Sequence, residues 1–165
     1  MAAVNVINPT DHHPTMRFPS ITGRNLLDKT IRIPEDLRSM RNLVIVAFRR
    51  YQQVQVDSWI EPLSEIENED FKFLEVPTLG TPYRLMRPII DGGMKGGIPD
   101  PEARERTVTV YLDKKDLKNR LSIDTEDYIR LFLLDRGGEI LWREEGSHSI
   151  KKFESLKDIL NIDHH

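Results

Sequence analysis

Hydrophobic and polar positions along the chain follow two periods, which predict strands alternating with helices. The run LVIVAF (residues 43–48) is apolar and largely β-branched, which is typical of a strand buried on both faces of a sheet. After it, Val56, Ile60 and Leu63 recur with the spacing of one helical face, and Pro62 within that stripe predicts a kink. This order indicates an α/β architecture.

The same alternation continues to the end of the chain. Runs rich in β-branched and aromatic residues predict further strands, and a Gly-containing turn joins the last two as an antiparallel hairpin. A final helix is predicted because Ile150, Phe153, Leu156 and Leu160 share one helical face. The further strands are residues 30–33, 71–76, 106–112, 129–134 and 139–143.

One domain accounts for most of the chain. Residues 17–165 are expected to form it, and residues 1–16, which lack a hydrophobic period, are expected to form a flexible N-terminal arm. We expect a central mixed sheet of about four or five strands, with strand 43–48 in parallel pairing. The expected core comprises Val44, Val46, Phe48, Ile60, Leu63, Phe73, Val108, Val110, Leu131, Leu133, Ile140, Phe153 and Leu156.

Composition and charge narrow the classes of function. The formal net charge is −3, which does not favour general attraction to nucleic acid. The longest apolar run, residues 43–48, is far shorter than the roughly 20 residues that span a bilayer, so no integral membrane segment is expected. No signal or transit peptide is evident at the N-terminus. We therefore expect a cytoplasmic or soluble organellar protein.

The chain contains no cysteine. This absence excludes disulfides, thiolate nucleophiles, Cys-ligated zinc and thiol redox catalysis from these residues. No serine lies in the sequence context of a nucleophile elbow. We therefore predict no catalytic residue and no cofactor.

The junction NLVIVAFRRYQQVQVDSW (residues 42–59) resembles the active-site junction of thioredoxins. In that superfamily a buried strand leads through an aromatic loop into a helix that begins with a CxxC motif, and a kinking proline follows the second cysteine by five residues. Counting back from Pro62 places Val54 and Asp57 at the two cysteine positions. The resemblance implies a thioredoxin-like three-layer fold without redox chemistry. Its groove would include Tyr51, Val54, Asp57 and Trp59.

A narrower resemblance rests on the order of four segments. They are RFPSITGRNLLDKTIRIPEDL, the junction itself, DGGMKGGIPD with RTVTVYLD, and IRLFLLDRGGEILWREEG. This order is similar to the assembly factor family of the mitochondrial ATP synthase membrane sector, a divergent thioredoxin-like family without a catalytic motif. The resemblance implies a protein partner, namely a membrane subunit of ATP synthase. The oligomeric state stays open.

The glycine-rich stretch DGGMKGGIPDPEARER (residues 91–106) supports two interpretations. It is expected to be a mobile loop that contacts a protein partner. Alternatively, backbone N–H groups at its glycines and nearby cations hold a small phosphorylated or carboxylated ligand. Convergence of the cations on one pocket would favour the ligand, and an apolar groove near Tyr51 and Trp59 would favour the partner. The residues concerned are Arg49, Arg87, Gly93, Lys95, Gly96 and Arg106.

Other polar residues are expected to have structural roles. Asp57 and Glu61 lie one helical turn apart and are expected to form salt bridges with neighbouring arginines rather than a catalytic pair. His148 is expected in the cap region of the last helix. The Asp-His-His triplets at residues 11–13 and 163–165 are interpreted as solvated termini, so no metal site is predicted.

Overall fold

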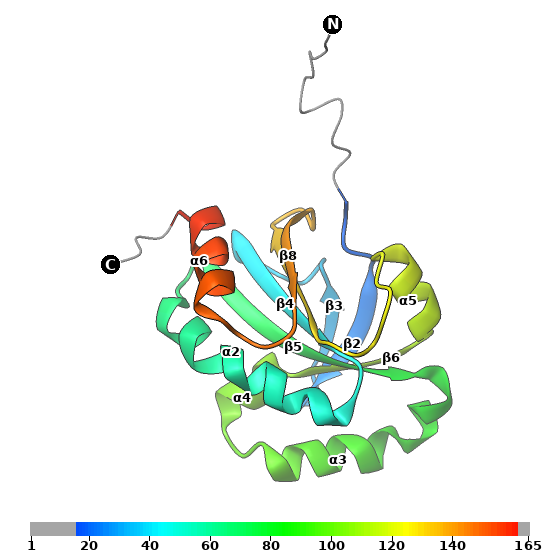
Figure 1. Ribbon diagram of the computed structural model, residues 1–165. Coiled ribbons are helices and arrows are strands. Elements are labelled where there is room, and N and C mark those ends of the chain that lie inside the picture. The colour runs from blue at the N-terminus through cyan, green and yellow to red at the C-terminus, as the bar shows by residue number, and fades with distance from the viewer. Residues whose placement is uncertain (1–15, 162–165) are drawn as a thin grey trace, which may run out of the picture.

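The computed structural model describes residues 16–161, which form a seven-stranded mixed sheet with helices on both faces (Figure 1). The strands are β2 (Ile21–Asn25), β3 (Thr30–Ile33), β4 (Arg41–Ala47), β5 (Phe71–Gly80), β6 (Val108–Leu112), β7 (Arg130–Asp135) and β8 (Ile140–Glu145). Their order across the sheet is β3-β2-β6-β5-β4-β7-β8. The helices are η1 (Arg50–Gln52), α2 (Gln53–Ile66), η2 (Thr81–Met86), α3 (Arg87–Gly97), α4 (Pro101–Arg106), α5 (Lys114–Arg120) and α6 (Ile150–Ile159).

Strand β4 is the central strand, and its side chains are buried on both faces. Leu43 and Ile45 join one apolar cluster with α2 and α6, whereas Val44 and Val46 join a second cluster that includes α5. β4 pairs in parallel with β5 and antiparallel with β7. The predicted parallel pairing of this strand is therefore confirmed, as is the antiparallel pairing of β7 with β8.

The predicted core is confirmed in its main members. Ten of the expected side chains are buried, and Ile60, Ile140 and Phe153 are partly buried and pack against one of the two clusters. The second cluster also includes residues that the sequence pattern did not single out, among them Phe18 and Leu121. The arm predicted at residues 1–16 lies, except for its last residue, outside the described residues.

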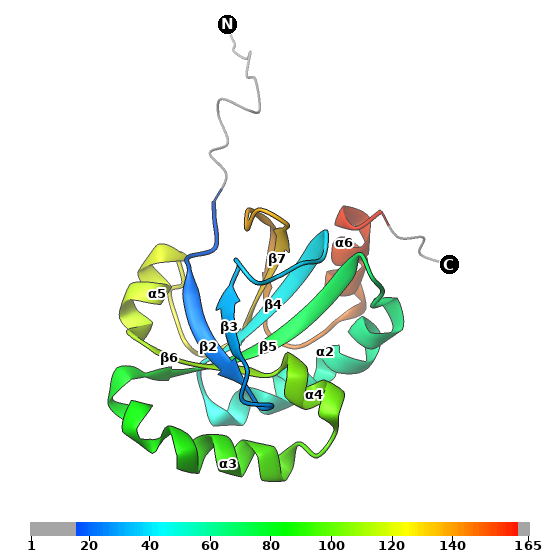
Figure 2. The ribbon, with the colours of Figure 1, turned by 180° about the vertical axis from the view of Figure 1, so that it is seen from behind.

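The sheet has seven strands where four or five were expected. Strand β2, a member of the sheet at the front of the view in Figure 2, carries no hydrophobic signal, because two of its three buried positions are Gly23 and Asn25. Gly23 packs directly on the backbone of β6: a Cβ built there would lie 2.6 Å from the carbonyl oxygen of Thr109. Asn25 accepts the backbone N–H groups of Leu27 and Lys29 and so orders the turn into β3.

The glycine-rich stretch begins as a helix and not as the loop that was expected. Helix α3 includes the four glycines of that stretch and ends at Gly97. The guanidinium of Arg104, in the following helix, donates to the carbonyl oxygens of Ile98 and Lys95, each at 2.6 Å. The Lys95 carbonyl also accepts the backbone N–H of Ile98 at 3.3 Å, so Arg104 adds a side-chain cap to the C-terminal end of α3.

Alanine at Gly23 should destabilise the fold, because its methyl group would collide with the backbone of Thr109. We expect Gly23→Ala to lower the free energy of unfolding by about 1–3 kcal/mol. Gly92→Ala is the matched control, since a Cβ there meets nothing within 4 Å and alanine is the better helix former. Urea denaturation of both variants checks this prediction, and equal stability of Gly23→Ala and wild type would contradict it.

Candidate functional site

The junction between β4 and α2 is organised by a buried amide. Gln52, which has no exposed surface, accepts the backbone N–H groups of Phe48 at 2.8 Å and Arg49 at 3.1 Å. Its side-chain N–H donates to the carbonyl oxygen of Glu126. Gln52 therefore joins the end of β4 to the loop before β7 and satisfies backbone groups that the strand no longer pairs.

A second glutamine, Gln55, also connects the junction to the segment before β7. Gln55, inside the sequence Val54-Gln55-Val56-Asp57, accepts the backbone N–H of Ile129 at 3.0 Å. Ile129 is fully buried and directly precedes β7. The two amides together hold the junction against the loop before β7. Neither an amide nor the neighbouring valines can act as a nucleophile, so these groups provide structure rather than bond chemistry.

The four residues of the expected groove do not share one environment. Val54 is 75% exposed and Tyr51 is 63% exposed, so both present apolar surface to solvent. Asp57 is exposed and accepts a hydrogen bond from the side chain of Gln53 at 2.9 Å. Trp59 is fully buried, which corrects its assignment to the groove. Its indole belongs to the core on the buried face of α2.

A cluster around Glu126 was not foreseen. The Glu126 carboxylate lies 3.2 Å from Arg49 Nε, 2.9 Å from Lys114 Nζ and 2.6 Å from Lys118 Nζ. Burial raises the pKa of Glu126, but hydrogen bonds from Lys118 and Lys114 outweigh burial, and the pKa lies below its usual range. Arg49 therefore pairs with Glu126. The expected pairing of Arg49 with Asp57 or Glu61 is not found among the described residues. No sequence signal links these residues, because α5 and the junction meet only in the folded chain.

The four cations proposed for the ligand do not converge on one pocket. Each has its own acidic partner, at distances from 2.8 to 3.5 Å. The pairs are Arg49 with Glu126, Arg87 with Asp91, Lys95 with Asp28, and Arg106 with Glu75. Gly93 and Gly96 lie in helix α3, where their Cβ positions face open space, and do not form a loop around an anion.

Two of these pairs are tied to the sheet. The Tyr111 hydroxyl donates to Asp91 at 3.2 Å, and the guanidinium of Arg87 lies over the Tyr111 ring. Burial and then the charge of Asp91 raise the pKa of Tyr111 to about 12, so its hydroxyl stays protonated at neutral pH. Burial likewise raises the pKa of Glu75 against the opposing effect of Arg106. These cations hold α3 and α4 on the sheet.

His148 lies behind the junction, just before α6. Its ring contacts Trp59 and Phe153 at centroid distances of 5.2 and 5.4 Å, and its buried Nε2 has no hydrogen-bond partner. Its backbone N–H donates to Ser58, which anchors the start of the last helix to α2. Ser149 caps α6, so the expected cap region is found here.

The described part of the chain shows neither a cluster of metal-ligating side chains nor a membrane-spanning helix. Residues 16–161 contain no group of three or more acidic or histidine side chains that could hold a metal ion. The two Asp-His-His triplets lie outside the described residues. None of the described helices is long and apolar enough to cross a bilayer.

Comparisons with known proteins support the fold and nothing narrower. No family model matches the chain, and no curated protein matches it. Among solved structures, a thiol:disulfide interchange protein from Bacteroides sp. aligns with a TM-score of 0.63 and 17% identity over 92% of each chain. The thioredoxin domain of a thiol-disulfide oxidoreductase from Bacteroides vulgatus aligns with a TM-score of 0.60 and 20% identity, over 88% of this chain and 96% of that one.

A third similar structure is the exposed lipoprotein thioredoxin of Streptococcus pneumoniae, with a TM-score of 0.59 and 12% identity over 87% of this chain and all of that one. Such likenesses show a thioredoxin-like fold. Thiol–disulfide interchange needs a thiol, and none of the 165 residues of this chain is cysteine. The narrower resemblance to the ATP synthase assembly factor stays a prediction.

Cysteines at positions 54 and 57 should form a disulfide. In helix α2 these positions are three residues apart, and Cα atoms at that spacing lie about 5 Å apart, within the bonding range. We expect mild oxidation of Val54→Cys/Asp57→Cys to remove both free thiols in the monomer. Val54→Cys/Glu61→Cys is the control, since its sites lie about 10 Å apart. Thiol titration is the measurement, and two free thiols in the folded first variant would refute the assigned register.

His148 should make stability sensitive to acid. Burial and then the charge of Lys152 hold its pKa below the usual 6.5. As pH falls through 6.5, the unfolded chain therefore takes up this proton before the folded chain does, and the free energy of unfolding decreases. We expect His148→Phe to lose less stability than wild type between pH 7.5 and 5.5, measured by urea denaturation.

Phe153→Leu is the control for this experiment. It alters packing on the same ring without removing a titrating group, so its stability should fall with pH as steeply as that of wild type. An equally steep fall in His148→Phe would show that His148 does not cause the acid sensitivity.

Proposed function

We propose that this protein is a redox-inactive, thioredoxin-like binding protein that holds an apolar protein partner. The observation that carries the proposal is an exposed apolar surface on η2 and the start of α3. Leu85 is 94% exposed and Ile89 is 72% exposed, although burying large aliphatic side chains stabilises a fold or a complex. We define the apolar surface as Tyr83, Leu85, Met86 and Ile89.

The glycines of α3 support the same proposal. A Cβ at any of Gly92, Gly93, Gly96 and Gly97 would meet nothing within 4 Å, so packing inside this chain does not require glycine there. Each glycine costs a helix about 1 kcal/mol relative to alanine. Ile89 and Gly93 lie one turn apart, so the open glycines continue the apolar surface along the helix. Small residues on a helix allow the backbone of a partner helix to approach closely.

The placement of the charges argues against the alternative of a small anionic ligand. Lys95, the cation between the glycines of α3, is 2.8 Å from Asp28, and the Arg87 guanidinium is 3.5 Å from Asp91. Because Lys95 and Arg87 each have an acidic partner, neither is a free cation that could hold a phosphate. An uncharged apolar partner is the better match for this helix.

The partner that we propose is a membrane subunit of ATP synthase, on the basis of the resemblance of the four segments to the assembly factor family. A transmembrane helix of such a subunit is apolar and needs cover before it enters its complex. Tyr51 in η1 and Val54 at the start of α2 supply further exposed apolar area. The start of α2 lies at the same lower end of the molecule as α3 in both Figure 1 and Figure 2. The protein would act at a membrane surface without spanning it.

Charges placed on the apolar surface should abolish partner binding. We expect Leu85→Glu/Ile89→Glu to fold normally, because both side chains are exposed, and to retain the membrane subunit at least about tenfold more weakly. The measurement is a pull-down from detergent-solubilised membranes of the source cell, with the ATP synthase subunits quantified by mass spectrometry.

Ile150→Glu is the matched control, since Ile150 is a similarly exposed side chain on α6, at 78%. It should retain the subunit as wild type does. Equal retention by Leu85→Glu/Ile89→Glu would rule out this surface. If inorganic phosphate raises the melting temperature of wild type but not of Lys95→Ala, and no subunit is retained, the ligand interpretation replaces the proposal.

A further inference from the structure

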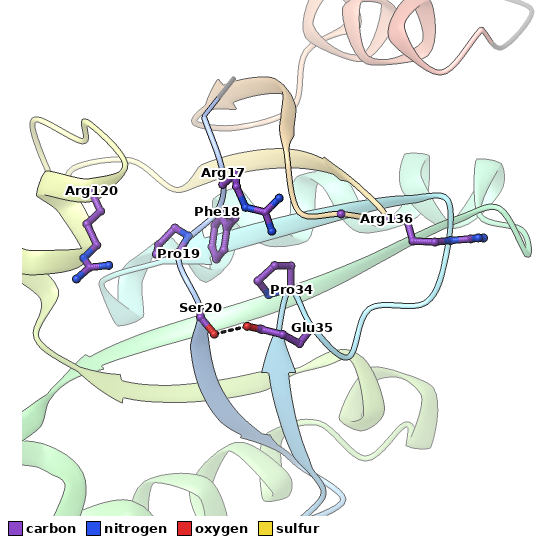
Figure 3. Close-up of a pocket in the computed structure, with 9 residues that line it drawn as sticks. Arg17, Phe18, Pro19, Ser20, Pro34, Glu35, Arg120 and Arg136 are labelled. Atoms are coloured by element: carbon purple, nitrogen blue, oxygen red, sulfur yellow. Dashed lines mark hydrogen bonds between the residues drawn. The ribbon is translucent and has the colours of Figure 1, made fainter. Parts of the chain in front are cut away.

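A groove with no assigned role runs beside the N-terminal segment and β2. Two adjacent hollows of about 470 and 340 Å³ share Pro19, Ser20 and Arg120, so they form one elongated groove. Figure 3 shows the larger hollow, whose lining comes from residues 17–20, the segment after β3, the end of α5 and the turn between β7 and β8. Four separate parts of the chain thus meet at one opening.

The floor of the groove is held by fixed contacts. The Phe18 ring is 3% exposed and packs edge-on against Phe132 at 5.6 Å, and the Phe18 backbone N–H donates to the carbonyl oxygen of Gly138 at 2.9 Å. Gly138 has a φ of +92°, and a Cβ built there would lie 2.7 Å from Pro34 Cγ. The groove therefore has its shape before any ligand arrives, which lowers the entropy cost of binding.

The larger hollow carries an excess of positive charge. Arg17, Arg120 and Arg136 line it together with one acid, Glu35. Glu35 accepts the Ser20 hydroxyl at 2.5 Å, and no ion pair in the described part of the chain joins it to these arginines. Arg120 pairs with Asp116 at 3.0 Å, while Arg17 and Arg136 have no ion pair within residues 16–161. In Figure 3 Arg17 lies above Pro34 and Arg120 lies at the other end, whereas Arg136 points away.

The second hollow follows an incompletely paired strand. The ladder between β2 and β6 joins only Arg24 to Thr109 and Asn25 to Val108. Ile21 and Thr22 precede that ladder and line the hollow opposite β6. Two cations, Arg84 and Arg120, and two acids, Asp113 and Asp116, also line this hollow, so its charges balance. β2 is an interior strand, paired with β3 on its other side, so only its side facing β6 is open here. Unpaired backbone groups on a strand can pair with an added extended chain, which is a common way to bind peptides.

We propose that this groove binds an extended acidic peptide segment. Its backbone would run along β2 at Ile21 and Thr22, and its carboxylates would lie near Arg17 and Arg120. Phe18, Pro19 and Pro34 supply apolar walls between these two cations. The elongated, open form suits an extended chain better than a compact small molecule, and the charge of the larger hollow favours acidic over basic sequences. This site is separate from the apolar surface and does not depend on the proposed function.

The test is fluorescence anisotropy of the full chain with a short labelled peptide of alternating Glu and Val. We expect saturable binding that weakens as salt rises, and no binding of the matching Lys–Val peptide. Arg17→Ala and Arg120→Ala should each weaken binding by about fivefold or more, through loss of a charge-assisted hydrogen bond. Lys151→Ala, on α6, and Leu85→Glu/Ile89→Glu should bind as wild type does.

Three results would overturn the proposal. The first is the absence of saturable binding by the folded wild type. The second is unchanged affinity in both arginine variants, with folding verified by circular dichroism. The third is displacement of the labelled peptide by free glutamate or inorganic phosphate as effectively as by unlabelled peptide, which would indicate a simple anion site.

Discussion

The burial of β4 on both faces is the constraint on which the rest of the structure depends. Because β4 pairs on both sides, its register also sets the positions of β5 and β7. Leu43 and Val44 point to opposite clusters, so a shift of one residue would exchange the two clusters. Everything that follows the strand, including the junction with α2, is positioned by this pairing.

At the junction between β4 and α2, the chain uses glutamine amides to hold neighbouring backbone segments. Gln52 and Gln55 take up the backbone N–H groups of Phe48, Arg49 and Ile129, and the Glu126 cluster secures the same loop with ion pairs. Hydrogen bonds of buried amides are costly to leave unmade, so these residues rigidify the site. The junction is therefore rigid, and without cysteine it has no thiol chemistry.

The surfaces proposed for binding differ in chemistry and in place. Leu85 and Ile89 offer uncharged apolar area on η2 and α3, whereas Arg17 and Arg120 offer charge along a groove at the start of β2. Internal ion pairs such as Lys95 with Asp28 neutralise cations of α3, whereas Arg17 in the larger hollow has no ion pair within residues 16–161. A partner with an apolar helix and an acidic extended segment could therefore engage both without competition between them.

The sequence by itself determined the central strand, the helix after it, the hairpin and the absence of thiol chemistry, because apolar periodicity and residue type are local properties. Tertiary structure decided what depends on remote contacts. Gly23 gives no strand signal by itself, because the need for glycine there comes from the close packing of Thr109. The guanidinium of Arg104 likewise caps the end of α3 from the following helix. The sequence pattern places Trp59 in the groove, but in the folded chain Trp59 is buried. The partners of Glu126 come together only where α5 meets the junction.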